Sequence, residues 1–220
     1  METKKLNSNE MLCQKMKEKL LNLCDYKYKF YKKNKVIYRE NMPSDDIYYL
    51  REGKAKIFIT NSKHKEHITK FVSSGDFFGI KNVISGENHW DSCKTIDNTT
   101  LCAIPKKDFL KVVKKYSDID YYLIQVLVKS SNETINTALS LYNKTEKERL
   151  ANALLCLCNK FRTDTIKILK KDLSNFSNIE RSKLKLHLSE LKEKNLIHLN
   201  SERIKICDKN GLRKMASILI

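Results

Sequence analysis

The sequence lacks the features of membrane-embedded and secreted proteins. No stretch approaches the roughly 18 consecutive apolar residues of a membrane-spanning helix. Residues 1–25 are interspersed with Lys, Glu and Asn and contain no apolar core of a secretory signal peptide. Internal repeats and low-complexity segments are also absent. We therefore expect a globular protein of the cytoplasm, with no membrane as a partner.

The seven cysteines form none of the usual cysteine patterns. Their number is odd, and their spacings match neither a disulfide framework nor a zinc site. Cys156 and Cys158 are two residues apart in a helical stretch, so their side chains should point to nearly opposite sides. Cys13 and Cys24 lack the tight cluster of an iron–sulfur site. We expect reduced, partly buried thiols, no metal and no iron–sulfur cofactor; a redox role stays an open alternative.

Patterns typical of enzymes are missing as well. The sequence has no Ser/His/Asp order, no phosphate-binding glycine loop and no zinc-protease motif, so we expect no catalysis. His64, His67 and His89 could suggest a metal or haem ligand. Because His64 and His67 flank a predicted turn, they should lie on the surface, and we expect no haem.

Positive charge is abundant and unevenly distributed. The formal net charge is +17. Residues 147–220 carry 17 Lys and Arg against 8 Asp and Glu, a net charge of +9, whereas residues 1–146 spread +8 over twice the length. A basic C-terminal segment suits a polyanionic partner, because binding phosphates releases condensed counterions. A Lys-rich surface that serves only solvation is the alternative, and charge alone does not decide between them.

Residues 28–105 have the texture of an antiparallel β-structure. Short apolar runs alternate with turn-forming segments such as residues 51–53 and 73–76. Many short strands at regular spacing are typical of a sandwich or barrel. Short helices over residues 7–24 and 106–113 should flank the strands. The predicted strands are Tyr28–Tyr31, Val36–Tyr38, Ile47–Leu50, Ala55–Thr60, His67–Val72 and Thr100–Ile104.

A long helix without Pro or Gly is predicted from Asp118 to about Tyr142. It carries two apolar stripes, so it should be covered on two sides. We expect one side to pack on its own β-domain and the other on a second copy, as a parallel coiled coil; a helix buried within a monomer is the alternative. The first stripe is Ile119, Leu123, Val126, Ser130, Thr134, Thr137 and Leu141. The second is Ile124, Leu127, Val128, Ile135, Ala138 and Tyr142.

The C-terminal part has the pattern of a winged helix-turn-helix. After a break at residues 143–145, Thr145 and Glu148 form a capping-box signal for a helix that ends near Phe161. A strand follows over residues 165–168. Two helices over residues 171–177 and 180–194 are then joined by a tight turn at Asn178. Strands at residues 196–199 and 204–206 with a turn between them predict a β-wing, and a final helix spans residues 208–219.

The second helix of this pair has the residues of a DNA-reading helix. Leu184, Leu188 and Leu191 fall on one narrow face and should be core. An α-helix fits the major groove, where Arg can bond guanine or phosphate, Ser can donate or accept, and Leu can contact a thymine methyl. Lys171 begins the preceding helix, and it and Lys170 before it suit backbone phosphates. The candidate DNA-binding residues are Arg181, Ser182, Lys183, Lys185, Leu186, Ser189, Lys170 and Lys171.

At this point the sequence resembles the family of the cyclic-AMP receptor protein and FNR. The resemblance rests on YKKNKVIY at residues 31–38, PSDDIYYLREG at 43–53, SGDFFG at 74–79, EKERLANALL at 146–155, NIERSKLKLHLSELKEKNLI at 178–197, and residues 203–206. It implies an α+β fold with three parts: a β-roll sensor, jelly-roll-like, at residues 1–117; a dimerisation helix at 118–144; and a winged helix-turn-helix at 145–220. It also implies homodimers that bind near-palindromic promoter DNA and regulate RNA polymerase.

Departures from that family concern the effector. Its cyclic-AMP-binding members carry a Gly-Glu pair and a later Arg-Ser or Arg-Thr pair that hold the ribose and the cyclic phosphate. Here Gly79-Ile80 and residues 89–92 stand in those regions, and Asp91 would repel a phosphate, so we do not expect cyclic AMP. Ser182 and Leu186 stand where Glu and Arg are common, which implies a different DNA half-site. Candidate effector-pocket residues are Gly79, Ile80, Lys81, His89, Trp90, Asp91, Ser92, Ser130 and Thr134.

Three hypotheses follow for the whole chain. The first is a sequence-specific transcription regulator whose effector is not cyclic AMP. The second is a ligand-binding regulatory module that acts through a protein partner rather than DNA. The third is a roll that binds nothing, with a constitutively active dimer controlled by its amount.

Overall fold

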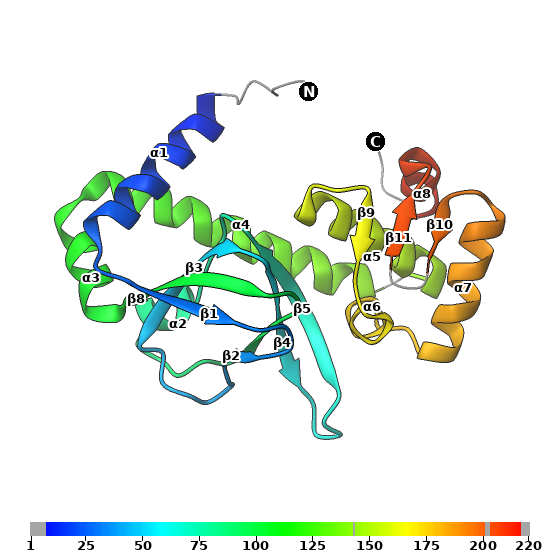
Figure 1. Ribbon diagram of the computed structural model, residues 1–220, viewed down its shortest axis with the longest axis horizontal. Helices are drawn as coiled ribbons and strands as arrows, with labels where there is room; N and C mark the ends of the chain where they lie inside the picture. Colours follow the sequence, from blue (N-terminus) through cyan, green and yellow to red (C-terminus); the bar gives the residue numbers. More distant parts are fainter. Residues whose placement is uncertain (1–7, 143, 201–202, 217–220) are drawn as a thin grey trace.

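The computed structural model describes residues 8–142, 144–200 and 203–216. They form a β-rich amino-terminal lobe, one long helix and a smaller carboxyl-terminal lobe (Figure 1). The predicted positions Asn143, Ser201, Glu202 and the end of the last helix near Leu219 lie outside the described residues. None of the described helices is long and apolar enough to cross a membrane.

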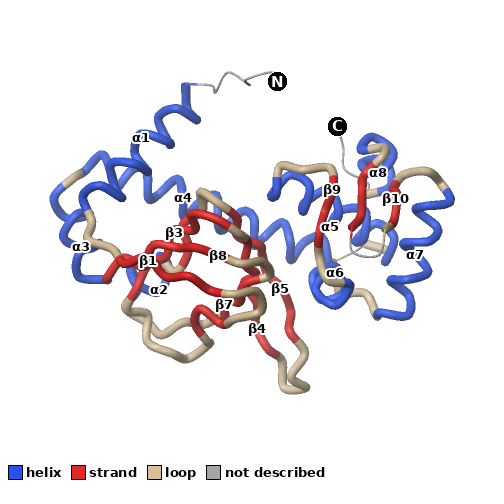
Figure 2. Tube along the Cα trace, in the orientation of Figure 1, coloured by secondary structure: helices blue, strands red, loops and turns tan. Residues whose placement is uncertain are grey.

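The amino-terminal lobe is a roll of two antiparallel four-stranded sheets (Figure 2). Alternating side chains of the strands pack between them, including Leu50, Ile57, Phe78 and Leu101. One sheet has the order β1-β8-β3-β6, formed by Lys27–Tyr31, Thr99–Pro105, Asp46–Glu52 and Phe77–Phe78. The other has the order β2-β7-β4-β5, formed by Val36–Tyr38, Ser92–Thr95, Lys54–Thr60 and Glu66–Ser73.

Four of the described helices belong to this lobe, and all four contribute to one apolar cluster. Leu20 of α1, Ile47 of β3, Phe109 of α3 and Ile119 of α4 are all fully buried within it. The helices are α1 (Ser8–Leu23), α2 (Ile80–Ser85), α3 (Lys106–Lys115) and α4 (Ser117–Leu141).

Helix α4 presents the two faces that its stripes predict. The stripe that begins at Ile119 and Leu123 is buried or half-buried against the roll. Of the second stripe, only Leu127 is half-buried; its other members are exposed, with Ile135 at 53% and Tyr142 at 76%. This exposure contradicts a helix fully buried within one monomer.

The carboxyl-terminal lobe has the predicted order of elements. Its own core contains Leu154, Ile166, Leu173, Leu188 and Leu212. Its helices are α5 (Glu146–Phe161), α6 (Lys170–Ser177), α7 (Arg181–Glu193) and α8 (Lys209–Met215). Strands β9 (Thr165–Lys167), β10 (Ile197–Leu199) and β11 (Arg203–Ile206) form a sheet of the order β10-β11-β9.

The structure adds three elements that the sequence pattern does not predict. Strand β6 has only two residues, and α2 follows directly on Gly79, whose φ of 82° is left-handed. Strand β7 begins at Ser92, which is one of the residues predicted for the effector pocket. The opposite orientation of Cys156 and Cys158 is confirmed, because Cys156 is exposed and Cys158 is buried.

Candidate nucleic-acid interface and effector pocket

Helix α7 has one buried and one free face. Leu184, Leu188 and Leu191 are 1%, 2% and 3% exposed, as the spacing of these leucines predicts. On the opposite face Leu186 is 58% exposed although its side chain is apolar. The polar candidates beside it, Arg181, Ser182, Lys183, Lys185 and Ser189, are also exposed. A basic helix face with one apolar side chain has the chemistry needed to contact phosphates and base edges.

The turn before α7 is held by Arg149 of α5. Asn178 closes α6 in the left-handed conformation with φ 50°. The Arg149 guanidinium donates to the carbonyl oxygens of Ser177 and Asn178, each at 3.0 Å, and to that of Lys144 at 3.0 Å. One planar guanidinium therefore bonds two carbonyls at the end of α6, where the helix itself supplies no backbone donor.

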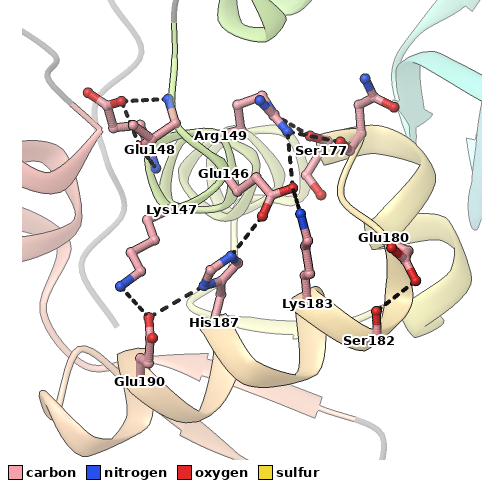
Figure 3. A network of polar contacts seen from close by, with 12 residues as sticks. Glu146, Lys147, Glu148, Arg149, Ser177, Glu180, Ser182, Lys183, His187 and Glu190 are labelled. Atoms are coloured by element: carbon pink, nitrogen blue, oxygen red, sulfur yellow. Dashed lines mark hydrogen bonds and ion pairs between the residues drawn. The ribbon is translucent and has the colours of Figure 1, made fainter.

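A network of charges ties one flank of α7 to the start of α5 (Figure 3). The Glu146 carboxylate lies 3.1 Å from His187 Nε2 and 3.4 Å from Lys183 Nζ. Glu190 accepts from Lys147 Nζ at 2.8 Å and lies 3.4 Å from His187 Nδ1. The hydrogen bond from His187, and then that from Lys183, holds the pKa of Glu146 below its ordinary value. Lys183 therefore belongs to this network as well as to the predicted DNA-binding set.

The other two candidates lie on α6, and further basic side chains lie on the wing. Lys170 and Lys171 are exposed at the first turn of α6. Ser182 donates to Glu180 Oε1 at 2.8 Å. Sequence reasoning missed Arg203 and Lys205 of the wing, which are exposed while Ile204 and Ile206 between and after them are buried. The alternation Arg-Ile-Lys-Ile is the signal that would have identified them.

A pocket lies where the roll meets α4. Its walls come from β5, β6, α2, the segment before β7, and α4. Of the predicted effector residues, the structure places Gly79, Ile80, Lys81, Trp90, Asp91, Ser130 and Thr134 in the lining. It places two outside. His89 is buried and stacked on Tyr38, with ring centroids 3.8 Å apart, and Ser92 Oγ accepts from the backbone of Glu40 at 3.0 Å.

Charged groups sit in this pocket with few partners. Lys70, which the sequence analysis missed, donates to Ser130 Oγ of α4 at 2.7 Å, and burial lowers its pKa. Burial raises the pKa of Asp91 to about 6, although a hydrogen bond from Tyr38 and the charges of Lys70 and Lys81 act in the opposite direction. Asp91 Oδ1 is buried and has no hydrogen-bond partner among the described residues. The pocket thus combines two cations with one carboxyl that is poorly satisfied by the protein.

Two family models match the chain, one for each lobe. The model of the cyclic nucleotide-binding domain matches residues 28–116, and that of the Crp-like helix-turn-helix domain matches residues 148–215. Together they cover more than half of the chain. The chain belongs to the Crp/Fnr family. The order of the two domains and the long helix between them agree with the fold expected from the resemblance.

The chain is also similar to individual members of the Crp/Fnr family. The transcriptional activator protein Anr of Pseudomonas protegens is 26% identical over 131 residues, 60% of this chain and 53% of Anr, so the match spans about half the length of that relative. The cyclic AMP receptor protein of Thermus thermophilus is 21% identical over 89% of this chain and 91% of its own. The structure of FixK2 from Bradyrhizobium japonicum superposes with a TM-score of 0.81 at 19% identity, covering 89% of this chain and all of FixK2; this supports the fold.

Proposed function

We propose that this Crp/Fnr protein is a sequence-specific DNA-binding transcription regulator that works as a homodimer on a near-palindromic promoter site. The observation that carries the proposal is the free basic face of α7, built around Arg181, Lys185 and Leu186. The basic wing residues and the lysines at the start of α6 are exposed as well and suit contacts to phosphates. We further propose RNA polymerase as a partner and the cytoplasm as the location.

The exposed stripe of α4 supports the dimer. Ile124, Val128, Ile135 and Leu139 are 56%, 53%, 53% and 62% exposed on one side of a 25-residue helix. An exposed apolar stripe of this length, interrupted only at Ser131, is costly in water and suits a second copy of the same helix. Two copies related by a twofold axis would present two α7 helices to one duplex.

We also propose that the pocket takes an effector other than cyclic AMP, and that the protein uses neither haem nor an iron–sulfur cluster. Ile80 follows Gly79, so no carboxylate is available beside that glycine for a ribose. The pocket cations are lysines, which lack the planar fork of an arginine for a phosphate. Among the described residues, no three His, Cys, Asp or Glu side chains come together as a metal-binding group.

The two other hypotheses have less support. A module that acts only through a protein partner gives no reason for the match of residues 148–215 to a Crp-like helix-turn-helix domain, and Anr, one of the relatives reported above, is a transcriptional activator by name. A roll without any ligand remains compatible with the pocket. A thermal-shift screen of metabolites tests it, because a specific stabiliser would contradict it.

Selection of duplexes from a random DNA pool, followed by mobility-shift measurement, tests the proposed function. We expect Arg181→Ala to weaken binding of the selected duplex by about 1–3 kcal/mol and to relax the base preference at one position of the site. Lys170→Ala should weaken binding of all DNA sequences alike. Lys33→Ala, which removes the same charge from an exposed position of the roll, is the control. Weak DNA binding without any sequence preference at physiological salt would refute the proposal of a sequence-specific regulator.

A further inference from the structure

The carboxyl-terminal lobe is docked on the roll through α6. Phe58, Ile68 and Phe71 of strands β4 and β5 belong to the same apolar cluster as the core of the winged lobe. Phe71 lies between Phe161 of α5 and Phe176 of α6, with ring centroids 5.7 and 5.0 Å away in edge-on geometry. Figure 1 shows α6 beside β5, with α7 on the side of α6 away from the roll. The first helix of the helix-turn-helix therefore serves as the attachment to the sensor.

A buried ion pair lies inside this attachment. Lys56 of β4 is 4% exposed, and its Nζ lies 2.6 Å from Asp172 Oδ1 of α6 and 2.5 Å from Glu66 Oε2 of β5. Asp172 is 2% exposed. Separation of α6 from the roll would leave buried Asp172 without a counter-charge and Lys56 with Glu66 alone, which is costly for charges removed from water. The pair therefore favours one placement of α6 on the roll over others that would bury the same apolar surface.

A second contact fixes the end of α5. Lys160 Nζ lies 3.0 Å from Asp76 Oδ2 in the turn after β5 and 3.5 Å from Glu133 Oε1 of α4. The Lys160 carbonyl also accepts a hydrogen bond from Ser73 Oγ at 3.3 Å. Because the winged lobe is attached at two separate places, its orientation is set by the roll and not only by the residues that follow α4. The reading face of α7 stays exposed in this docked arrangement.

We propose that Lys56 and Asp172 are positioning residues for DNA binding. They hold α6 on the roll, so that the two α7 helices of a dimer keep one fixed separation that matches one spacing of half-sites on the duplex. This proposal rests on the proposed dimeric DNA-binding function. Half-sites read by helix-turn-helix dimers are about 34 Å apart, one helical turn, and a winged lobe that is free to swivel would tolerate other spacings.

The test compares half-site spacing selectivity between variants. The probes are the duplex that the wild-type protein selects from a random pool and two versions with the centre lengthened or shortened by two base pairs. The variants are Asp172→Ala, which leaves Lys56 paired with Glu66 alone, and Lys56→Met, which leaves both Asp172 and Glu66 without their counter-charge. Asp164→Ala is the matched control, because it removes the same charge from the same lobe at an exposed ion pair with Lys209.

We expect the wild type and Asp164→Ala to prefer the selected spacing by roughly a hundredfold, since both half-sites must be bound at once. Asp172→Ala and Lys56→Met should bind the selected duplex about tenfold more weakly and prefer it by less than about fivefold. An apolar pair of similar volume can replace a buried ion pair, and water can reach the 17% exposed side chain of Glu66 once Lys56 is gone; Lys56→Met combined with Asp172→Leu should therefore restore the preference. Circular dichroism and thermal unfolding establish that each variant is folded. If Asp172→Ala does not fold, Asp172→Asn replaces it.

Two results would overturn the proposal while leaving the proposed function intact. In the first, Asp172→Ala and Lys56→Met keep the spacing preference of the wild type. In the second, they bind the selected duplex more tightly, which would make the docked arrangement inhibitory. A wild-type protein that binds the selected sequence but has no spacing preference would instead overturn the dimeric function, and the proposal with it.

Discussion

Replacement of Arg149 by alanine should destabilise the carboxyl-terminal lobe more than any exposed arginine does. Its side chain is 16% exposed and donates three hydrogen bonds to backbone carbonyls. Hydrogen bonds to a charged group are worth roughly 1.5–3 kcal/mol each. Water can replace the bond at exposed Asn178, but not the one at Ser177, which is 1% exposed. We therefore expect Arg149→Ala to lower the free energy of unfolding by about 2–4 kcal/mol.

Chemical denaturation followed by circular dichroism measures this loss. The control is Arg213→Ala in the same lobe, which removes the same charge and a single exposed hydrogen bond to Asn210. Arg149→Lys keeps the charge but replaces the fork by a single nitrogen, so it should recover less than half of the loss. DNA affinity should fall in parallel, because the turn at Asn178 sets the direction of α7. If the free energies of unfolding of Arg149→Ala and the Arg213→Ala control differed by less than about 0.5 kcal/mol, the hydrogen bonds of Arg149 would not stabilise the lobe as proposed.

Two further predictions concern the pocket and the dimer. Since the folded-state pKa of Asp91 is about 6 against an ordinary value of 3.8, ionisation of this group costs the folded protein stability as the pH rises from 4 to 6. Asp91→Asn should therefore be more stable than the wild type at pH 7, by at most about 3 kcal/mol, and equally stable near pH 4. Chemical denaturation of both proteins at the two pH values measures this, and the same difference in free energy of unfolding at pH 4 and pH 7 would contradict the prediction. Ile135→Glu with Leu139→Glu should convert the dimer to a monomer in sedimentation experiments, because both side chains are more than half exposed on the apolar stripe. Asn136→Glu, exposed on a neighbouring face, should remain dimeric, and a dimer that survives the double change would exclude this stripe as the interface.

The winged lobe was predictable because its signals are local. The leucines of α7 recur at helical spacing, and the Thr145 capping box, with its hydrogen bond to the Glu148 backbone at 3.3 Å, follows from two residues three positions apart. The two faces of α4 followed in the same way from periodicity. The strands of the roll were predicted to within one or two residues at their ends, apart from β6 and β7.

The charged side chains that join distant segments could not be predicted. Asp172 stands in the first turn of α6, where an acidic residue is ordinarily solvent-exposed, and only the arrival of Lys56 from 116 residues earlier explains its burial. Lys70 was missed because the pairing of β4 and β5 shifts register between Ile57 and Phe58. This irregularity brings both Thr69 and Lys70 to the pocket, whereas strict alternation would send one of them away from it.

Two consecutive residues of strand β5, Lys70 and Phe71, contact different parts of the protein. Lys70 reaches the pocket and α4, while the ring of Phe71 is enclosed by two helices of the winged lobe. A strand is a single layer of backbone, with no packed core to absorb a shift between its two sides. A substitution at Thr69 or Lys70 that changes what the pocket accepts would therefore also disturb the seat of the DNA-reading lobe. Redesign of ligand preference through this strand would need compensating changes around Phe71.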